Sequence, residues 1–172
     1  SGNFDLRGRI HGGDAFPPNY NLGLVTGGYS ATTVTSSSGN ISLSGWSNDG
    51  TAVYIDGGNG DDVPASVVSA GSGSGSHNII VRAHNDENGL AFENYGSLTT
   101  SGVVNLRPGG VDPDGDLFET TDDAIVVESS PSWGFSISPS ELNNITAGTL
   151  ILGSDWQNGS ITVNAPITRY GN

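Results

Sequence analysis

The 172-residue chain contains no cysteine, no methionine and no lysine, and these absences exclude several classes of structure. Without cysteine, the chain can form neither disulfide bonds nor thiolate metal sites. Without lysine, it cannot form a lysine–asparagine isopeptide cross-link. Five arginines stand against 18 acidic residues, which gives a formal net charge of −13. We therefore expect no nucleic-acid binding, because that function needs clustered basic residues.

Long apolar runs and helical periodicity are also lacking. No run of about 18 apolar residues occurs, so we expect no insertion into a membrane as a helix. Apolar residues do not follow helical spacing for more than one turn. The one short helix that we predict lies at residues 139–144, where Ser138 or Ser140 can cap it. No signal-peptide pattern follows Ser1, which indicates a mature or excised segment.

What the sequence does contain is many short, β-branched apolar clusters separated by glycine-rich turns. Glycine accounts for 27 of the 172 residues. The apolar centres are spaced at 12, 14, 12, 11 and 13 residues along the series Ile41, Val53, Val67, Ile79, Leu90 and Val103. Such regular spacing predicts an all-β fold with a strand in each interval.

Two architectures are compatible with this spacing: an antiparallel sandwich or barrel, and a solenoid with coils of about 20 residues. The segments Gly39–Leu43, Gly148–Leu152 and Gly159–Val163 favour the solenoid. In each of them, two apolar residues alternate with an intervening residue that we expect to face solvent. The strands are also shorter than those of a typical sandwich.

Several segments resemble those of large filamentous-haemagglutinin-like exoproteins of two-partner secretion systems. The clearest are Leu98–Asp112 (LTTSGVVNLRPGGVD) and Gly134–Ser154. Gly39–Gly45, Thr51–Gly58 and Gly159–Ile167 also fit, so the resemblance covers roughly residues 39–167. It implies a right-handed parallel β-helix, export from a bacterium and a place on the cell surface. It does not imply a particular ligand.

We therefore predict an all-β, right-handed parallel β-helix of about seven to eight coils that forms a single domain over residues 1–172. Residues 39–172 are expected to form regular coils. Residues 1–38 resemble the family poorly, and we expect them to form a cap, an insertion or an inter-subunit junction, with a loop at Phe16–Tyr20.

The two ends of the chain resemble each other at a shift of 157 residues. The matched apolar positions are Phe4 with Ile161, Leu6 with Val163 and Ile10 with Ile167. If these segments are equivalent, the chain takes part in tandem repeats or stacks end to end with other copies.

One acidic loop has the composition of a calcium site. Asp112, Asp114 and Asp116 occupy alternate positions, and Asp123 falls at the twelfth position of the same loop. Carboxylate oxygens on a tight loop suit Ca²⁺. The alternative is an acidic turn that is simply solvated.

Aromatic and titratable residues give weaker indications. Trp46, Trp133 and Trp156 are candidates for stacking against a carbohydrate or a partner, although corner aromatics often cover a core instead. The three histidines have no zinc-site spacing, and we expect them in exposed loops. The adjacent acids 86–87 and 122–123 are candidates for a glycosidase pair, but acids are common at turns.

Taken together, these features predict a secreted, non-catalytic bacterial surface protein, a β-helical shaft or fibre segment. It would self-associate end to end or occur in tandem, and carbohydrate or a host surface is the expected ligand. The alternatives are an extracellular filament or sheath subunit that polymerises end to end, and a β-helical enzyme that acts on polysaccharides.

Overall fold

The computed structural model describes residues 3–10, 22–26, 32–58, 65–71, 77–112 and 114–168. Within these ranges nearly all of the regular secondary structure is β-strand, and the strands form a nearly closed, largely parallel wall around an apolar core. The predicted loop at Phe16–Tyr20 lies outside the described residues.

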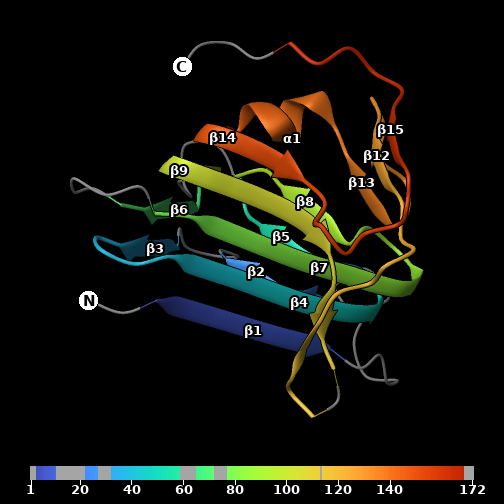
Figure 1. Cartoon of the computed structure of the whole chain (residues 1–172), viewed down its shortest axis with the longest axis horizontal. Coiled ribbons are helices and arrows are strands. Elements are labelled where there is room, and N and C mark those ends of the chain that lie inside the picture. Colours follow the sequence, from blue (N-terminus) through green and yellow to red (C-terminus); the bar gives the residue numbers. More distant parts are fainter. Residues whose placement is uncertain are drawn as a thin grey trace.

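The first stack of parallel strands has five levels. It is formed by β1 (Phe4–Ile10), β4 (Ile41–Asp49), β7 (Ile79–Asn88) and the second halves of β9 (Ser97–Pro108) and β14 (Ile145–Leu152). Figure 1 shows these strands one above another, from β1 at the bottom to β14 near the top. Equivalent positions across the five levels are Phe4, Ile41, Ile79, Val104 and Leu150.

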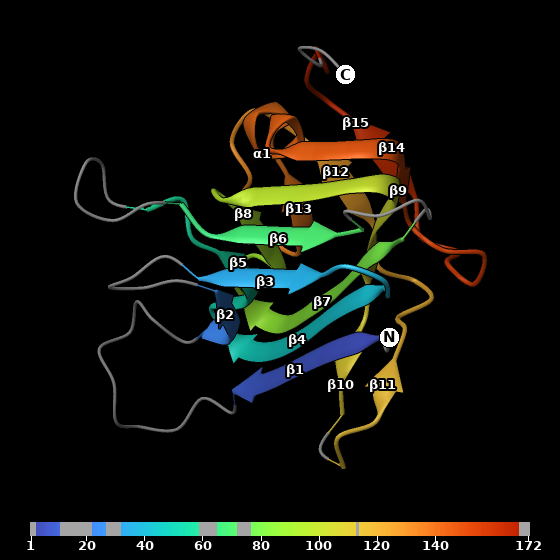
Figure 2. The same cartoon turned by 90° about the vertical axis from the view of Figure 1, so that its left-hand side faces the viewer.

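The second stack lies beside the first and shares two of its strands. It consists of β3 (Thr33–Ser36), β6 (Val67–Ala70) and the first halves of β9 and β14. Figure 2 shows these strands in the same vertical order. Because β9 and β14 run through both stacks, all of these strands belong to one seven-stranded sheet.

A third wall faces these two stacks. Its lower part is the parallel sheet β2 (Leu22–Thr26), β5 (Thr51–Ile55) and β8 (Phe92–Asn94). Its upper part is the parallel sheet β13 (Phe135–Ile137), β12 (Ile125–Val127) and β15 (Ile161–Val163), in that order. The stacked rings of Phe92 and Phe135, with centroids 6.2 Å apart, join the two parts.

An antiparallel hairpin is attached to this parallel wall. Its strands are β10 (Gly110–Val111) and β11 (Leu117–Phe118). Figure 1 shows that the hairpin projects beyond β1 and forms no level of its own.

The spacing of the apolar centres corresponds to the sides of a coil. The steps from Ile41 to Val53, Val67 and Ile79 carry the chain through three walls and back to the strand directly above Ile41. One such turn takes 38 residues, and the other turns of the first stack take 37, 25 and 46. The expected coil of about 20 residues was therefore wrong. The first stack has five levels, and no solenoid of seven to eight coils is seen among the described strands.

The N-terminal segments take part in the same stacking. β1, β2 and β3 lie in register beneath β4, β5 and β6, so the described parts of residues 1–38 form a level of all three walls. The proposed equivalence of the chain ends is not seen. Phe4 lies in the first stack and pairs with Ile41, whereas Ile161 lies in the third wall and pairs with Ile125.

The alternation of side chains within each strand separates core from surface. Ile41 and Leu43 are fully buried, and Ser42 between them is half-buried on the outer face. The same inward positions are taken by Ile79 and Val81 one level above, which are also fully buried. Each such side chain stabilises the fold by about 1.5–3 kcal/mol relative to its exposed state.

A ladder of asparagine side chains supports the first stack along one edge. The Asn3 Oδ1 atom accepts a hydrogen bond from the backbone N–H of Asn40 (3.2 Å), and Asn40 Oδ1 accepts one from Asn78 (2.8 Å). Asn78 Oδ1 in turn accepts a hydrogen bond from the backbone N–H of Val103 (3.0 Å). Each side chain therefore satisfies a backbone donor one level above it, just before a strand at Asn40 and Asn78 and within β9 at Val103.

The predicted short helix is confirmed as α1 (Pro139–Asn143), beside β14. Ser138 is its N-cap and forms a capping box with Glu141. In the part of the chain that the structure describes, no helix has the length and apolarity needed to span a bilayer.

Candidate functional site

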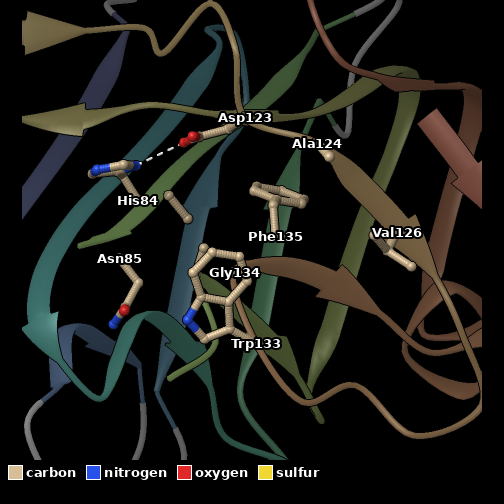
Figure 3. Close-up of a pocket in the computed structure, with 10 residues that line it drawn as sticks. His84, Asn85, Asp123, Ala124, Val126, Trp133, Gly134 and Phe135 are labelled. Atoms are coloured by element: carbon tan, nitrogen blue, oxygen red, sulfur yellow. Dashed lines mark hydrogen bonds and ion pairs between the residues drawn. The ribbon is translucent and has the colours of Figure 1, made fainter. Parts of the chain in front are cut away.

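The candidate site is a pocket of about 100 Å³ between β7, the segment that enters β12, and β13. Figure 3 shows the side chains around it: the imidazole of His84, the indole of Trp133 and the phenyl ring of Phe135. The remaining walls are small, and they come from Ala83, Ala91, Ala124, Val126 and Gly134 with Asn85 and Asp123 at the sides.

His84 is held between two carboxylates. Its Nδ1 atom lies 2.9 Å from an oxygen of Asp123, and its Nε2 atom lies 2.7 Å from an oxygen of Asp86. An imidazole that donates to carboxylates through both nitrogens must be protonated. The edge of the ring packs against Phe118 at a centroid distance of 5.5 Å, so this contact also joins the hairpin to the sheet.

The pKa values of this group reflect its geometry. Burial lowers the pKa of His84, but the hydrogen bonds and charges of Asp123 and Asp86 outweigh it and raise the pKa above the usual 6.5. The hydrogen bond from His84 holds the pKa of Asp123 below its usual 3.8. Each group therefore favours the charged form of the other.

Trp133 presents a fixed aromatic surface at the rim of the pocket. Its side chain is 64% exposed, yet its Nε1–H donates to the backbone oxygen of Glu87 at 2.8 Å. Phe135 beside it is buried. An indole held in place but left open to solvent is suited to contact a ligand.

The chemistry of the pocket favours binding over proton transfer. A general base needs a free lone pair, and both ring nitrogens of His84 are already engaged by Asp123 and Asp86. The Asp123 carboxylate lines the pocket and remains 41% exposed, so the pocket still offers acceptor oxygens.

Sequence reasoning missed this site because it placed the histidines in loops. His84 lies within β7, where alternation puts Ile79, Val81 and Ala83 inside and His84 outside. One acid from each adjacent pair in the sequence, Asp86 and Asp123, converges on it. The signal in the sequence is the alternation of residues 79–84, which continues the strand through His84 and makes β7 ten residues long.

The four predicted calcium ligands are not brought together. The Asp112 carboxylate accepts hydrogen bonds from the backbone N–H groups of Asp114 (3.0 Å) and Asp116 (2.8 Å), which closes the β10–β11 turn. Asp123 pairs with His84 instead. Among the described residues no group of three or more acids and histidines is arranged to hold a metal ion, and calcium binding stays a prediction.

The three tryptophans differ in exposure. Trp46 is 7% exposed and belongs to the core, which agrees with the alternative that a corner aromatic covers the core. Trp156 is 74% exposed and borders a shallower groove of about 330 Å³ on the outer face of β7, β9 and β14. Trp133 and Trp156 therefore remain available for contact.

Comparison with known proteins identifies no relative. No protein-family model, no curated protein and no solved structure matches the chain. The resemblance to filamentous-haemagglutinin-like exoproteins thus stays a hypothesis.

Proposed function

We propose that the chain is a non-catalytic shaft or fibre segment of a secreted bacterial surface protein, built as a right-handed parallel β-helix. In such a segment, the strands of each level pair through backbone hydrogen bonds with the strands of the next level. The chain's mechanical role then follows from continuous parallel pairing, and its binding role follows from side chains on the outside of the wall.

The observation that supports this proposal is the uncovered apolar end beside β15. Ile161 and Val163 pair in register with Ile125 and Val127, which are fully buried. Parallel partners point to the same side of a sheet, so Ile161 and Val163 face the core side, yet they are 51% and 55% exposed. A further level of similar strands, from the same polypeptide or from another copy, would bury them.

The second function that we consider is a subunit that polymerises end to end. It is favoured by β1, at the edge of the seven-stranded sheet, where Phe4 is in register with the buried Ile41 and is 42% exposed. Two exposed, core-facing ends with unpaired strand edges can meet in a head-to-tail contact, which generates filaments.

Sedimentation velocity combined with electron microscopy of the pure protein tests this proposal. We expect concentration-dependent association into rods of uniform width. The double substitution Ile161→Asp with Val163→Asp should abolish association, because it places charge in the apolar contact.

Thr162→Asp is the matched control, because Thr162 lies on the same strand but faces the other side. It should leave association unchanged. A protein that stays monomeric at every concentration, or that loses association equally in the control, would contradict the proposal that this end pairs with a further level.

A further inference from the structure

We propose that the pocket between His84 and Trp133 binds an alkylammonium group, such as a lysine side chain or a small aliphatic amine. This inference goes beyond the shaft function and does not depend on it. It rests on three properties of the pocket: its size, the state of its hydrogen-bonding groups and its charge.

The first property is the small, mainly apolar volume. At about 100 Å³, the pocket is smaller than the cavity of about 150 Å³ that holds benzene in another protein. A sugar ring is too large to be enclosed there, whereas a chain of a few methylene groups fits between Ala83, Ala91 and Phe135. Figure 3 shows the indole of Trp133 along one side of this space.

The second property is that the ring N–H groups of the lining residues, and one amide N–H of Asn85, are already donated within the protein. His84 donates to Asp123 and Asp86, Asn85 donates to the backbone oxygen of Gly50, and Trp133 donates to that of Glu87. The charged group of the lining that is still able to contact a ligand is an acceptor, the partly exposed carboxylate of Asp123. A site of acceptors and aromatic faces selects a ligand that only donates, and an ammonium group has three donors and no acceptor.

The third property is the charge at the mouth of the pocket. Asp123 lines the pocket, and Asp86 lies outside its lining against the other ring nitrogen of His84, so two negative charges stand against one on protonated His84. Arg82, the nearest arginine along β7, pairs with Glu119 at 3.6 Å. The exposed indole of Trp133 adds the favourable interaction of a cation with an aromatic face.

The occupant is a different molecule from this chain, at least for the lysine form of the ligand. The sequence contains no lysine, so a second copy cannot supply one. The pocket therefore provides recognition of a foreign surface or solute, separately from contacts between like chains.

The test is a titration of the full chain followed by NMR at the Trp133 indole N–H. The probes are n-butylammonium, 1-butanol as its uncharged isostere, glucose, and an N-acetyl-lysine amide. We expect saturable shifts with n-butylammonium and binding of 1-butanol and glucose weaker by about tenfold or more. If the lysine amide binds as well as n-butylammonium, a protein side chain is the natural source of the group; if it does not, the source is a free amine.

Variants locate the interaction. Asp123→Asn and Trp133→Leu should each weaken n-butylammonium binding by about tenfold. Because Asp123→Asn also removes a partner of His84, Trp133→Leu, which leaves both carboxylate partners of His84 in place, is the variant that separates loss of the site from loss of the ion pair. The matched control is Asp122→Asn, an exposed acid next to Asp123 that does not line the pocket, and it should change affinity by less than about twofold.

Three outcomes would overturn the proposal. They are the absence of a saturable shift, equal affinity for n-butylammonium and 1-butanol, and equal weakening by Asp122→Asn and Asp123→Asn. End-to-end association is measured by sedimentation at a different surface, so the two proposals can fail separately.

Discussion

At the scale of single residues, His84 makes folding depend on pH. Its pKa is raised in the folded state, so its contribution to stability is complete below its usual pKa of 6.5 and is lost as the pH rises through the folded value. The contribution of Asp123, whose pKa is lowered, is present above 3.8 and is lost as the pH falls through its folded value. Together these shifts stabilise the protein most between those two usual values.

We therefore predict that the free energy of unfolding, measured with urea, is larger at about pH 6 than at about pH 8.5. The difference should shrink in His84→Gln. In Asp123→Asn, the pKa of His84 measured by NMR should fall, because the main partner of its charged form is gone. A His84 pKa at or below 6.5 in the unmodified protein would contradict this account.

Glu141 is a second residue whose surroundings predict a measurable effect. It is 4% exposed, and its carboxylate accepts hydrogen bonds from the backbone N–H of Asn94 (3.0 Å) and from both the N–H and the hydroxyl of Ser138 (2.8 and 2.7 Å). Glu141→Ala leaves these donors without an acceptor, and we expect it to lower the free energy of unfolding by about 3 kcal/mol.

Ser140→Ala provides the comparison, because Ser140 lies on the same helix and is exposed. Thermal or urea unfolding should place it within about 0.5 kcal/mol of the unmodified protein. Equal stability of the Glu141→Ala and Ser140→Ala variants would show that the hydrogen bonds of the buried carboxylate do not stabilise the fold.

Residue identity alone predicts burial poorly for aromatic and titratable side chains. Trp46, Trp133 and Trp156 all precede or follow polar turns in the sequence, yet one is core and two are exposed. The difference arises from neighbours more than thirty residues away, such as β7 beside Trp46. The pairing of His84 with Asp123 is equally hard to predict from the sequence, because the two residues lie 39 positions apart.

At the scale of elements, the asparagine ladder is what fixes the vertical register of the first stack. Each asparagine of the ladder lies just before a strand, and each ladder bond joins consecutive levels. We predict that Asn78→Ala lowers stability by about 1–3 kcal/mol, because the backbone N–H of Val103 loses its acceptor. Asn78→Asp keeps an acceptor oxygen and should cost less. Urea unfolding of both variants checks the order, and a reversed order would contradict the role of the ladder.

Glycine allows the backbones of consecutive levels to approach closely where β9 and β14 pass from the second stack to the first. A Cβ atom on Gly102 would collide with the backbone oxygen of His77 one level below, and one on Gly148 would collide with that of Ser101. The levels approach closely there, which explains why glycine precedes the apolar-alternating segments at both places.

Most strand positions followed from the sequence, because alternation is a local property. The inward face was predicted correctly at Ile41 and Ile79, but Val68 and Val104 are fully buried where the spacing pointed to Val67 and Val103. The number of residues per coil did not follow, because it depends on which strand lies above which. A clue was present in the recurrence of asparagine before an alternating apolar pair, at Asn3, Asn40 and Asn78. These positions are 37 and 38 residues apart, which is the length of a whole turn. It is about three times the spacing between successive apolar centres.

At the scale of the whole molecule, the protein combines a strongly acidic composition with apolar side chains exposed at β1 and β15. The net charge of −13 repels like chains sideways, whereas the exposed, core-facing residues of β1 and β15 favour contact along the axis. In the proposed end-to-end assembly, charge repulsion therefore disfavours side-by-side contacts more than contacts between the apolar ends. Rising salt should screen the sideways repulsion without weakening the apolar end contact.

The central claim is that strands far apart in the sequence stack in parallel, one turn above another. Methyl NOE spectroscopy tests it most directly. The account predicts NOEs from Leu43 to Val81 and from Val81 to Leu106, which lie at the same inward position on three successive levels. Strong Hα–Hα NOEs between consecutive segments such as β4 and β5, the mark of antiparallel hairpins, together with the absence of those methyl contacts, would contradict it.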